Sequence, residues 1–128
     1  MRERLEQTRL SVNRDFSVGA GEDKLSGTVV VGLYEDGRPG EMFIHLDKPD
    51  LLCGFLDGLA TVTSMALQHG VPLADICDKL MYTQFEPSGW TGDKTHPFAK
   101  SLLDYIFGWM QRRFVGREAE HGAAHEPG

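Results

Sequence analysis

The chain lacks an apolar run long enough to cross a membrane. Its most apolar stretch, residues 51–67, is interrupted by Gly54, Asp57 and Gly58, whereas a membrane-spanning helix needs roughly 18 consecutive apolar residues. The first residues also lack the apolar centre of a signal peptide, because charged side chains surround Leu5. We therefore expect a cytoplasmic protein with no membrane partner.

Positive charge is scarce as well. Thirteen Lys and Arg residues face nineteen Asp and Glu residues, which gives a formal net charge of −6, and no segment concentrates the basic side chains. Proteins that bind duplex DNA or RNA neutralise its phosphates with such a concentration of Lys and Arg. We therefore expect no DNA partner.

Cysteine occurs only twice, at Cys53 and Cys77. These positions are too far apart for a CxxC redox or zinc pair, and His45, His69 and His96 form no short ligand spacing with them. Isolated cysteines among apolar residues usually behave as small hydrophobic side chains. We expect both to be structural, on the apolar side of their helices and without a disulfide, and we expect no metal site.

What the sequence does contain is the make-up of one globular domain, with 41% apolar and 25% charged residues over 128 positions. Apolar side chains alternate from Leu10 to Val18, a period of two that predicts a strand. Two more strands are expected at 28–34 and 42–46, joined by a turn with Asp-Gly and Pro-Gly pairs. The first third is thus expected to form an antiparallel sheet of about three strands.

From Asp50 onward the apolar spacing becomes helical. It predicts helices near 51–69, 72–84 and 97–114, the first capped by Asp50 and with its apolar face including Leu51, Phe55 and Val62. The expected fold is α+β, with the three helices packed on one face of the sheet. Residues 1–115 would form the domain, and 116–128, without aromatic or β-branched residues, a disordered tail.

Motifs of catalysis are absent from the sequence. Gly89 and Gly92 are followed by Asp93, which is the wrong residue and spacing for a phosphate-binding loop. No nucleophile elbow surrounds a serine, and helical carboxylates such as Asp104 are more often salt-bridge partners than acids or bases. We expect no catalytic residue.

The segment 86–96 is the strongest candidate for a recognition site, because long loops within compact domains are often functional. It combines a large aromatic side chain, carboxylates and flexible glycines. The candidate ligand- or partner-binding residues are Phe85, Glu86, Ser88, Trp90, Thr91, Asp93 and His96. A structural interpretation stays open, in which Trp90 only pins the loop onto the sheet and Ser88 and Thr91 only make local turns. His96 is also a candidate cap of the following helix.

Four ordered blocks of the sequence are together similar to one known family. They are VGLYEDGRPGEMFI at 31–44, SMALQHGVPL at 64–73, FEPSGWTG at 85–92 and AKSLLDYIF at 99–107. With these blocks, the chain from about residue 2 to 115 resembles the TSCPD-type domain near the C-terminus of adenosylcobalamin-dependent (class II) ribonucleotide reductases.

The resemblance implies a component of such a reductase with no active site of its own, because the radical chemistry of the family needs a large barrel domain with active-site cysteines and a cobalamin site. Adenosylcobalamin is then expected in the catalytic chain alone, with no cofactor on this chain. Two features depart from the family pattern. Arg14-Asp15-Phe16 and Gly19-Ala20-Gly21 replace His-containing motifs, and 117–128 has no cysteine, so neither a histidine ligand site nor a redox relay is implied.

Two functional interpretations remain. In the first, the chain is an accessory piece that docks on a class II reductase catalytic chain. In the second, it is an autonomous regulatory module that kept the fold and binds a nucleotide or another protein. Because the helix surface around Gly54 and Gly58 needs cover in a chain with three helices, we also expect a homodimer or a hetero-complex.

Overall fold

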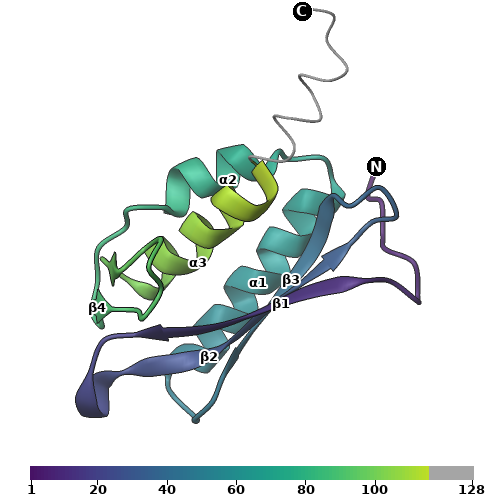
Figure 1. Ribbon diagram of the computed structural model, residues 1–128. Coiled ribbons are helices and arrows are strands. Elements are labelled where there is room, and N and C mark those ends of the chain that lie inside the picture. Colours follow the sequence, from purple (N-terminus) through teal and green to yellow (C-terminus); the bar gives the residue numbers. More distant parts are fainter. Residues whose placement is uncertain (116–128) are drawn as a thin grey trace, which may run out of the picture.

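The computed structural model describes residues 1–115, and the tail predicted at 116–128 lies outside them. A three-stranded antiparallel sheet is followed along the chain by three α-helices, which confirms the expected α+β class (Figure 1). None of the helices among these residues is long and apolar enough to span a membrane.

The sheet is a simple meander in the order β1-β2-β3. Its strands are β1 (Ser11–Val18), β2 (Leu25–Leu33) and β3 (Pro39–Leu46). A short 3₁₀ turn, Gly21–Asp23, joins the first two. Both later strands begin three residues before the predicted positions, because the ladder extends to the ends of the two connecting turns.

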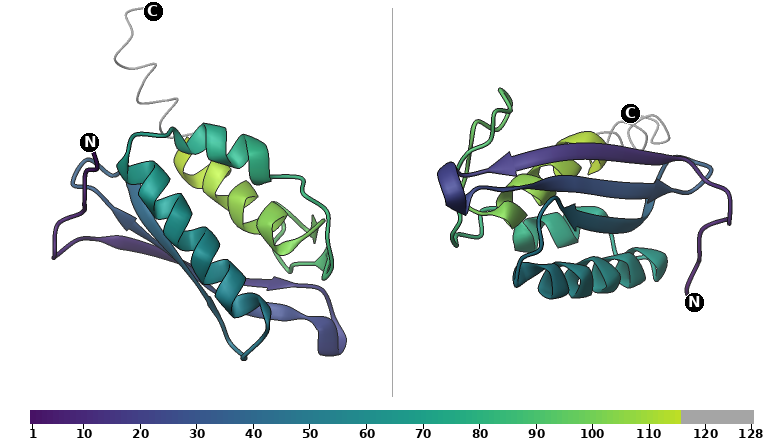
Figure 2. Two further views of the ribbon diagram at one scale, coloured as in Figure 1. Left: turned by 180° about the vertical axis from the view of Figure 1, so that it is seen from behind. Right: turned by 90° about the horizontal axis from the view of Figure 1, so that it is seen from below.

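Only one face of the sheet is covered, and the alternation of side chains explains why. Inward positions carry large apolar residues, namely Phe16, Val18, Val29, Val31, Met42 and Ile44, all buried. The other face carries mainly small polar side chains, such as Ser17 and Thr28. The left view of Figure 2 shows all the helices on the same side of the sheet. The apolar face therefore selects the side on which the helices pack.

The helices are α1 (Leu52–Gln68), α2 (Leu73–Leu80) and α3 (Leu102–Met110), the last continued by a π-helical turn, Gln111–Val115. The N-cap position of α1 is Leu51, one residue after the predicted Asp50, and it makes no side-chain cap hydrogen bond. The carboxylate of Asp50 still accepts a hydrogen bond from the amide of Leu52 at 2.9 Å. Helix α1 lies over β3, where the Ser64 hydroxyl accepts a hydrogen bond from the amide of Met42 at 2.8 Å.

Helix α3 is the centre of the core. Tyr105, Ile106, Phe107 and Met110 are almost completely buried, and the rings of Trp109 and Phe114 meet edge to face at 5.7 Å. Cys77 of α2 is fully buried in the same core, whereas Cys53 of α1 is only half-buried, and both remain thiols.

Two helix boundaries differ from the sequence prediction. Helix α2 ends at Leu80 and not near residue 84, because Tyr82 adopts a left-handed backbone with φ 64°. Helix α3 begins at Leu102 and not at Pro97, because the Ser101 hydroxyl caps it by accepting the amide of Asp104 at 3.0 Å. Residues 97–100 are left to pair with the preceding loop.

Part of the apolar face predicted for the first helix is wrong. Leu51, Phe55 and Val62 are exposed, with 79% of Phe55 and 64% of Val62 accessible to solvent. A helix resting on one sheet buries a single stripe of side chains, here the one through Leu56 and Ala60. The apolar pattern of α1 is wider than that stripe.

Candidate functional site

The candidate loop is a short hairpin held beside the end of the sheet. Strand β4 (Gly89–Trp90) pairs antiparallel with β5 (Phe98–Ala99), and the turn between them is closed by the Thr91 amide, which donates to the carbonyl of Pro97 at 3.0 Å. Figure 1 shows this hairpin at one end of the molecule, beyond the first turn of α3. The sequence prediction treated residues 86–96 as an irregular loop and placed Phe98 and Ala99 in the third helix, so both assignments are corrected by the pairing.

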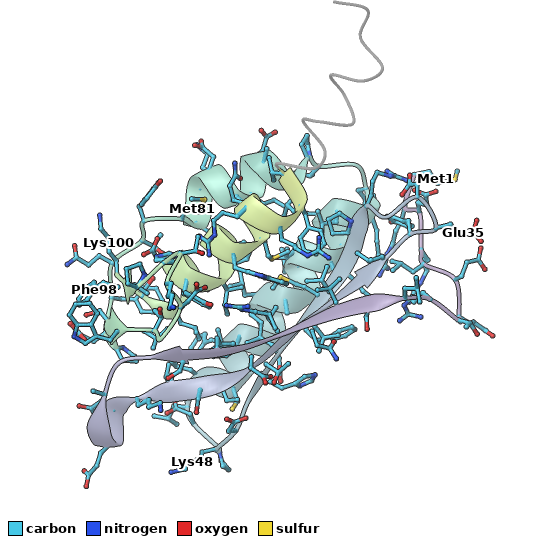
Figure 3. All side chains as sticks on the ribbon, viewed as in Figure 1. Met1, Glu35, Lys48, Met81, Phe98 and Lys100 are labelled. Carbon is cyan, nitrogen blue, oxygen red and sulfur yellow. The ribbon has the colours of Figure 1, made fainter. Side chains whose placement is uncertain are left out.

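Trp90 lies on the outside of the hairpin. The residue is 67% exposed, and its ring meets the ring of Phe98, a residue that is 51% exposed, edge to face with centroids 5.4 Å apart. The side chain therefore does not hold the hairpin against the sheet, which disagrees with the interpretation of Trp90 as a loop staple. Figure 3 shows Phe98 projecting outward at this end.

Two more aromatic side chains accompany this pair. The amide of Phe85 donates to the carbonyl of Lys100 at 3.2 Å, which places Phe85 next to β5. The ammonium group of Lys100 lies 5.6 Å from the centre of the Tyr82 ring, a cation–π contact. Figure 3 places Lys100 and Phe98 at the same end. We call the four exposed aromatic residues Tyr82, Phe85, Trp90 and Phe98 the aromatic end.

Asp93 is the residue that ties the hairpin to the rest of the fold. Its Oδ2 accepts a hydrogen bond from the Tyr105 hydroxyl of α3 at 2.7 Å and an ion-paired hydrogen bond from Arg14 of β1 at 2.9 Å. A second guanidinium, that of Arg112, stands 3.8 Å away. The other oxygen accepts the amide of Thr95 at 2.9 Å. One carboxylate thus joins the hairpin, the sheet and the last helix.

These contacts shift the acidity of the groups involved. Partial burial works to raise the pKa of Asp93, but the hydrogen bonds from Tyr105 and the Thr95 amide, with the charges of the two arginines, hold that pKa below its ordinary value. Burial raises the pKa of Tyr105, and its hydrogen bond to the Asp93 carboxylate raises it further. The Asp93 carboxylate is therefore charged at neutral pH, so that it keeps both its ion pair with Arg14 and its hydrogen bond from Tyr105.

His96 belongs to a second set of polar contacts, with Asp104 and Arg112. Its Nε2 is 3.3 Å from the Asp104 carboxylate, and its Nδ1 is 3.4 Å from Arg112. Because the carboxylate only accepts and the guanidinium only donates, this geometry fits the tautomer with its proton on Nε2. His96 is not the cap of α3, since Ser101 fills that position.

Asp104 is almost completely buried at 3% exposure and accepts the amides of Tyr82 and Lys100, each at 2.9 Å. These two bonds fix the segments on either side of the hairpin. Asp104 therefore acts as a structural anchor of the aromatic end. Of the other helical carboxylates weighed in the sequence, Asp57 and Asp78 are exposed.

The hairpin also approaches the sheet through backbone alone. The amide of Gly19 donates to the carbonyl of Trp90 at 3.1 Å. A Cβ added to Gly89, whose φ is 140°, would lie 3.1 Å from the Gly19 Cα. Gly89 therefore needs to be glycine for this close approach, whereas Gly19 favours glycine because of its positive φ of 96°.

The predicted site residues therefore separate into two groups. Asp93 and His96 face the body and hold the hairpin, Thr91 closes its turn by donating to the His96 carbonyl, and Phe85 and Trp90 face solvent. Glu86 and Ser88 bond only to each other in the turn that precedes β4, where the Ser88 amide donates to the Glu86 carboxylate at 3.0 Å. The seven residues do not converge on one pocket.

Sequence reasoning missed Arg14, Tyr105 and Arg112 as partners of this site. A signal for Arg14 was available: the alternation from Leu10 to Val18 places position 14 on the inward face, where a charged residue needs a partner. Tyr105 and Arg112 carry no comparable signal, because their roles depend on where the hairpin docks.

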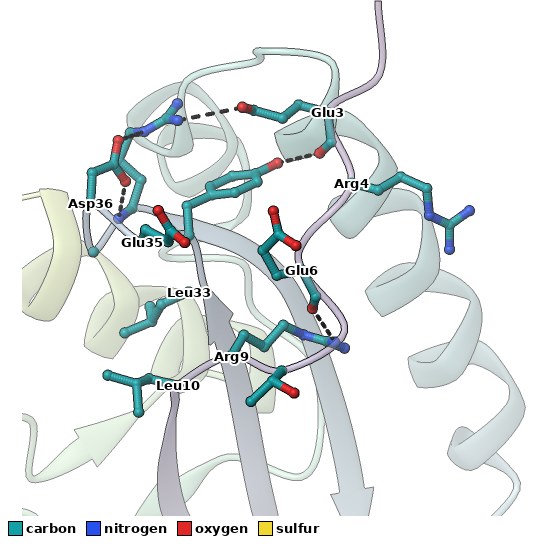
Figure 4. A pocket seen from close by; sticks show the side chains of 12 residues that line it. Glu3, Arg4, Glu6, Arg9, Leu10, Leu33, Glu35 and Asp36 are labelled. Atoms are coloured by element: carbon teal, nitrogen blue, oxygen red, sulfur yellow. Dashed lines mark hydrogen bonds and ion pairs between the residues drawn. The ribbon is translucent and has the colours of Figure 1, made fainter.

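A separate hollow of about 570 Å³ lies between the N-terminal segment and the β2–β3 turn (Figure 4). The Tyr34 hydroxyl donates to the carbonyl of Glu3 at 2.5 Å, and the guanidinium of Arg38 pairs with Glu3 and with Asp36. Charges of both signs are thus already paired along its wall. Among residues 1–115 no three His, Cys, Asp or Glu side chains are grouped as metal ligands would be.

Comparison with known proteins supplies the family. The TSCPD domain model matches residues 3–114. A vitamin B12-dependent ribonucleotide reductase of Rhodopirellula baltica is 45% identical over 115 residues, which are 89% of this chain and 11% of that protein. Reductases of the same name from Streptomyces avermitilis and Bradyrhizobium diazoefficiens are 35% and 39% identical over 84% and 67% of the chain.

The chain spans about a tenth of the length of these relatives, 11% of the Streptomyces protein and 7% of the Bradyrhizobium protein. No solved structure matches it. The match to the family model over almost all of the described residues, together with these relatives, establishes that the chain belongs to the TSCPD domain family.

Proposed function

We propose that this chain is a non-catalytic accessory domain of a B12-dependent ribonucleotide reductase and that its aromatic end docks on the catalytic chain. The family supports the reductase context, since the relatives matched by this domain carry that name. The observation that carries the docking role is the exposed Trp90–Phe98 pair on a hairpin anchored by Asp93. Exposed, rigidly mounted aromatic side chains are typical centres of binding energy at protein interfaces.

The described residues are a poor fit for adenosylcobalamin. The hollow at the N-terminal segment is about 570 Å³ and open, with paired charges on its wall. Pockets of about 300–1,000 Å³ suit drug-sized ligands, and a corrin cofactor with its adenosyl and nucleotide arms is larger than these. The proposal therefore assigns no step of the reaction to a cofactor on this chain.

The test compares Trp90→Ala with the wild type in two assays, a melting curve and capture by a class II reductase catalytic chain. Since two thirds of Trp90 is exposed, its removal should cost less than about 2 kcal/mol in folding, taken from roughly 80 Å² of lost burial. Binding should weaken by about 2 kcal/mol, or roughly thirtyfold. Glu86→Ala is tested alongside.

Trp109 provides a matched control in the same chain, because it is the other tryptophan and only 8% exposed. Trp109→Ala should cost about 3–5 kcal/mol in folding, as core aromatic truncations do. Unchanged capture by Trp90→Ala would end the docking proposal. Binding of a nucleotide to the chain alone, with no capture of a reductase chain, would favour the autonomous module in its place.

A further inference from the structure

The outer side of α1 carries an exposed apolar stripe. Leu51, Phe55, Val62 and Met65 are all exposed, and Gly58 lies among them with no atom within 4 Å of an added Cβ. We call these five residues the α1 stripe. The left view of Figure 2 shows no helix or strand over the side of α1 that faces away from the sheet.

The spacing of the stripe is that of a helix–helix seam. Its positions follow one another by four, three, four and three residues, the alternation of the two core positions in a heptad repeat. The side that faces the sheet is separate and runs through Leu56, Ala60 and Leu67. Helix α1 is therefore apolar on two sides, of which the fold of one chain covers one.

The surface around the α1 stripe carries much less charge than the rest of the molecule. The chain has a net charge of −6, yet α1 contains a single charged residue, Asp57, outside the stripe. An electrostatically selected partner would need complementary charges on this face. A neutral, apolar seam suits a second surface of the same kind.

The area is sufficient for a small interface. The exposed parts of the four large side chains amount to roughly 500 Å², within the range of the largest apolar patches on monomeric proteins. Two such stripes facing each other remove roughly 1,000 Å², about the minimum for a specific interface.

The sequence of the stripe also suits antiparallel packing of two copies about a two-fold axis. Gly58 stands midway between Leu51 and Met65, seven residues from each. With an axis beside Gly58, Leu51 would oppose Met65 of the second copy. The large side chain of Phe55 would oppose the smaller side chain of Val62 in that copy. Gly58 allows the two backbones to approach at the centre, where a long or branched side chain would separate them.

We propose that the α1 stripe is the interface between two copies of this chain, packed antiparallel about a two-fold axis beside Gly58. The interface uses residues distinct from the aromatic end, so two copies would present two separate aromatic ends to their partners. The proposal goes beyond the accessory role and does not depend on it.

The test measures the mass of the complete chain by sedimentation from low to high micromolar concentration. The wild type should be a concentration-dependent dimer. Val62→Glu, which buries a carboxylate in the seam from each copy, should raise the dissociation constant at least about tenfold. Trp90→Glu is the matched control, because it places the same charge on an equally exposed side chain of the other surface and should leave the dimer intact.

A covalent test avoids dependence on the charged variant. Gly58→Cys should form a disulfide-linked dimer under mild oxidation, beyond the background from the half-buried Cys53. A wild-type monomer at every concentration would overturn the proposal. A dimer that Val62→Glu leaves unchanged, or Gly58→Cys without cross-linking, would overturn it as well. These assays use the chain alone, so their failure is distinct from a failure to capture the reductase chain.

Discussion

Replacing Asp93 with asparagine should loosen the aromatic end without altering its surface. The substitution keeps the size of the side chain but removes its charge, so the ion pair with Arg14 at 2.9 Å is lost and the hydrogen bond from Tyr105 becomes an ordinary one. Hydrogen bonds to charged groups contribute about 1.5–3 kcal/mol. Because Arg14 is 41% exposed, solvent screening reduces its share, and we expect a loss of about 2 kcal/mol in the free energy of unfolding.

The lowered pKa of Asp93 sets the direction in which the stability difference should change with pH. Aspartate in an unfolded chain has a pKa of about 3.9, and the pKa of Asp93 in the folded state is lower. The stability that Asp93 contributes is therefore complete above its unfolded pKa and is lost as the pH falls through its folded pKa. The difference between wild type and Asp93→Asn should be largest at pH 7 and should shrink below about pH 4.

Urea unfolding at several pH values measures both quantities. Asp78→Asn, on an exposed position of α2, is the matched control and should change the free energy of unfolding by less than about 0.5 kcal/mol. Equal unfolding midpoints for wild type and Asp93→Asn at neutral pH would refute the role of Asp93 as the tie. A difference that is independent of pH would show that the charge plays no part in it.

Two further predictions concern glycines. Gly54→Ala adds a Cβ with nothing within 4 Å and should stabilise α1 by about 0.5–1 kcal/mol, whereas Gly108→Ala, whose Cβ would lie 3.0 Å from the His96 ring, should fail to stabilise α3. Both variants are measured by urea unfolding in the Val62→Glu background, so that association of two copies does not contribute. An equal gain in the free energy of unfolding for both variants would contradict the close contact between Gly108 and His96. Gly27→Ala, whose Cβ would overlap the His45 carbonyl oxygen, should cost at least about 3 kcal/mol, and a native-like melting temperature would show that the β2–β3 pairing is not this close.

The sheet and the first helix could be predicted because their signals are local. The alternation from Leu10 to Val18 and the helical spacing after Asp50 are set by neighbours a few residues apart, and both elements lie within a few residues of their predicted positions. The first residue of α3 could not be predicted from the local sequence pattern. Pro97 is acceptable at the start of a helix, but Phe98–Ala99 pairs with Gly89–Trp90 of a separate segment, and the helix begins only after its Ser101 cap.

The same limit applies to the candidate site. The sequence identified the segment that forms the hairpin, because its glycines and tryptophan are unusual in a compact domain. It could not separate Asp93, which faces inward, from Trp90, which faces outward. That separation depends on partners 79 and 12 residues away, Arg14 and Tyr105, which a local pattern does not report.

The long separation between Arg14 and Asp93 bears on how the chain folds. The three strands and α1 contact their neighbours along the sequence, and such local contacts form quickly because little loop-closure entropy opposes them. The β4–β5 hairpin is joined to the sheet only after the large loop between Arg14 and Asp93 has closed, and it then covers Tyr105 of α3, which is only 2% exposed. The aromatic end should therefore assemble after the sheet and α3, because Arg14 of β1 and Tyr105 of α3 hold it in place.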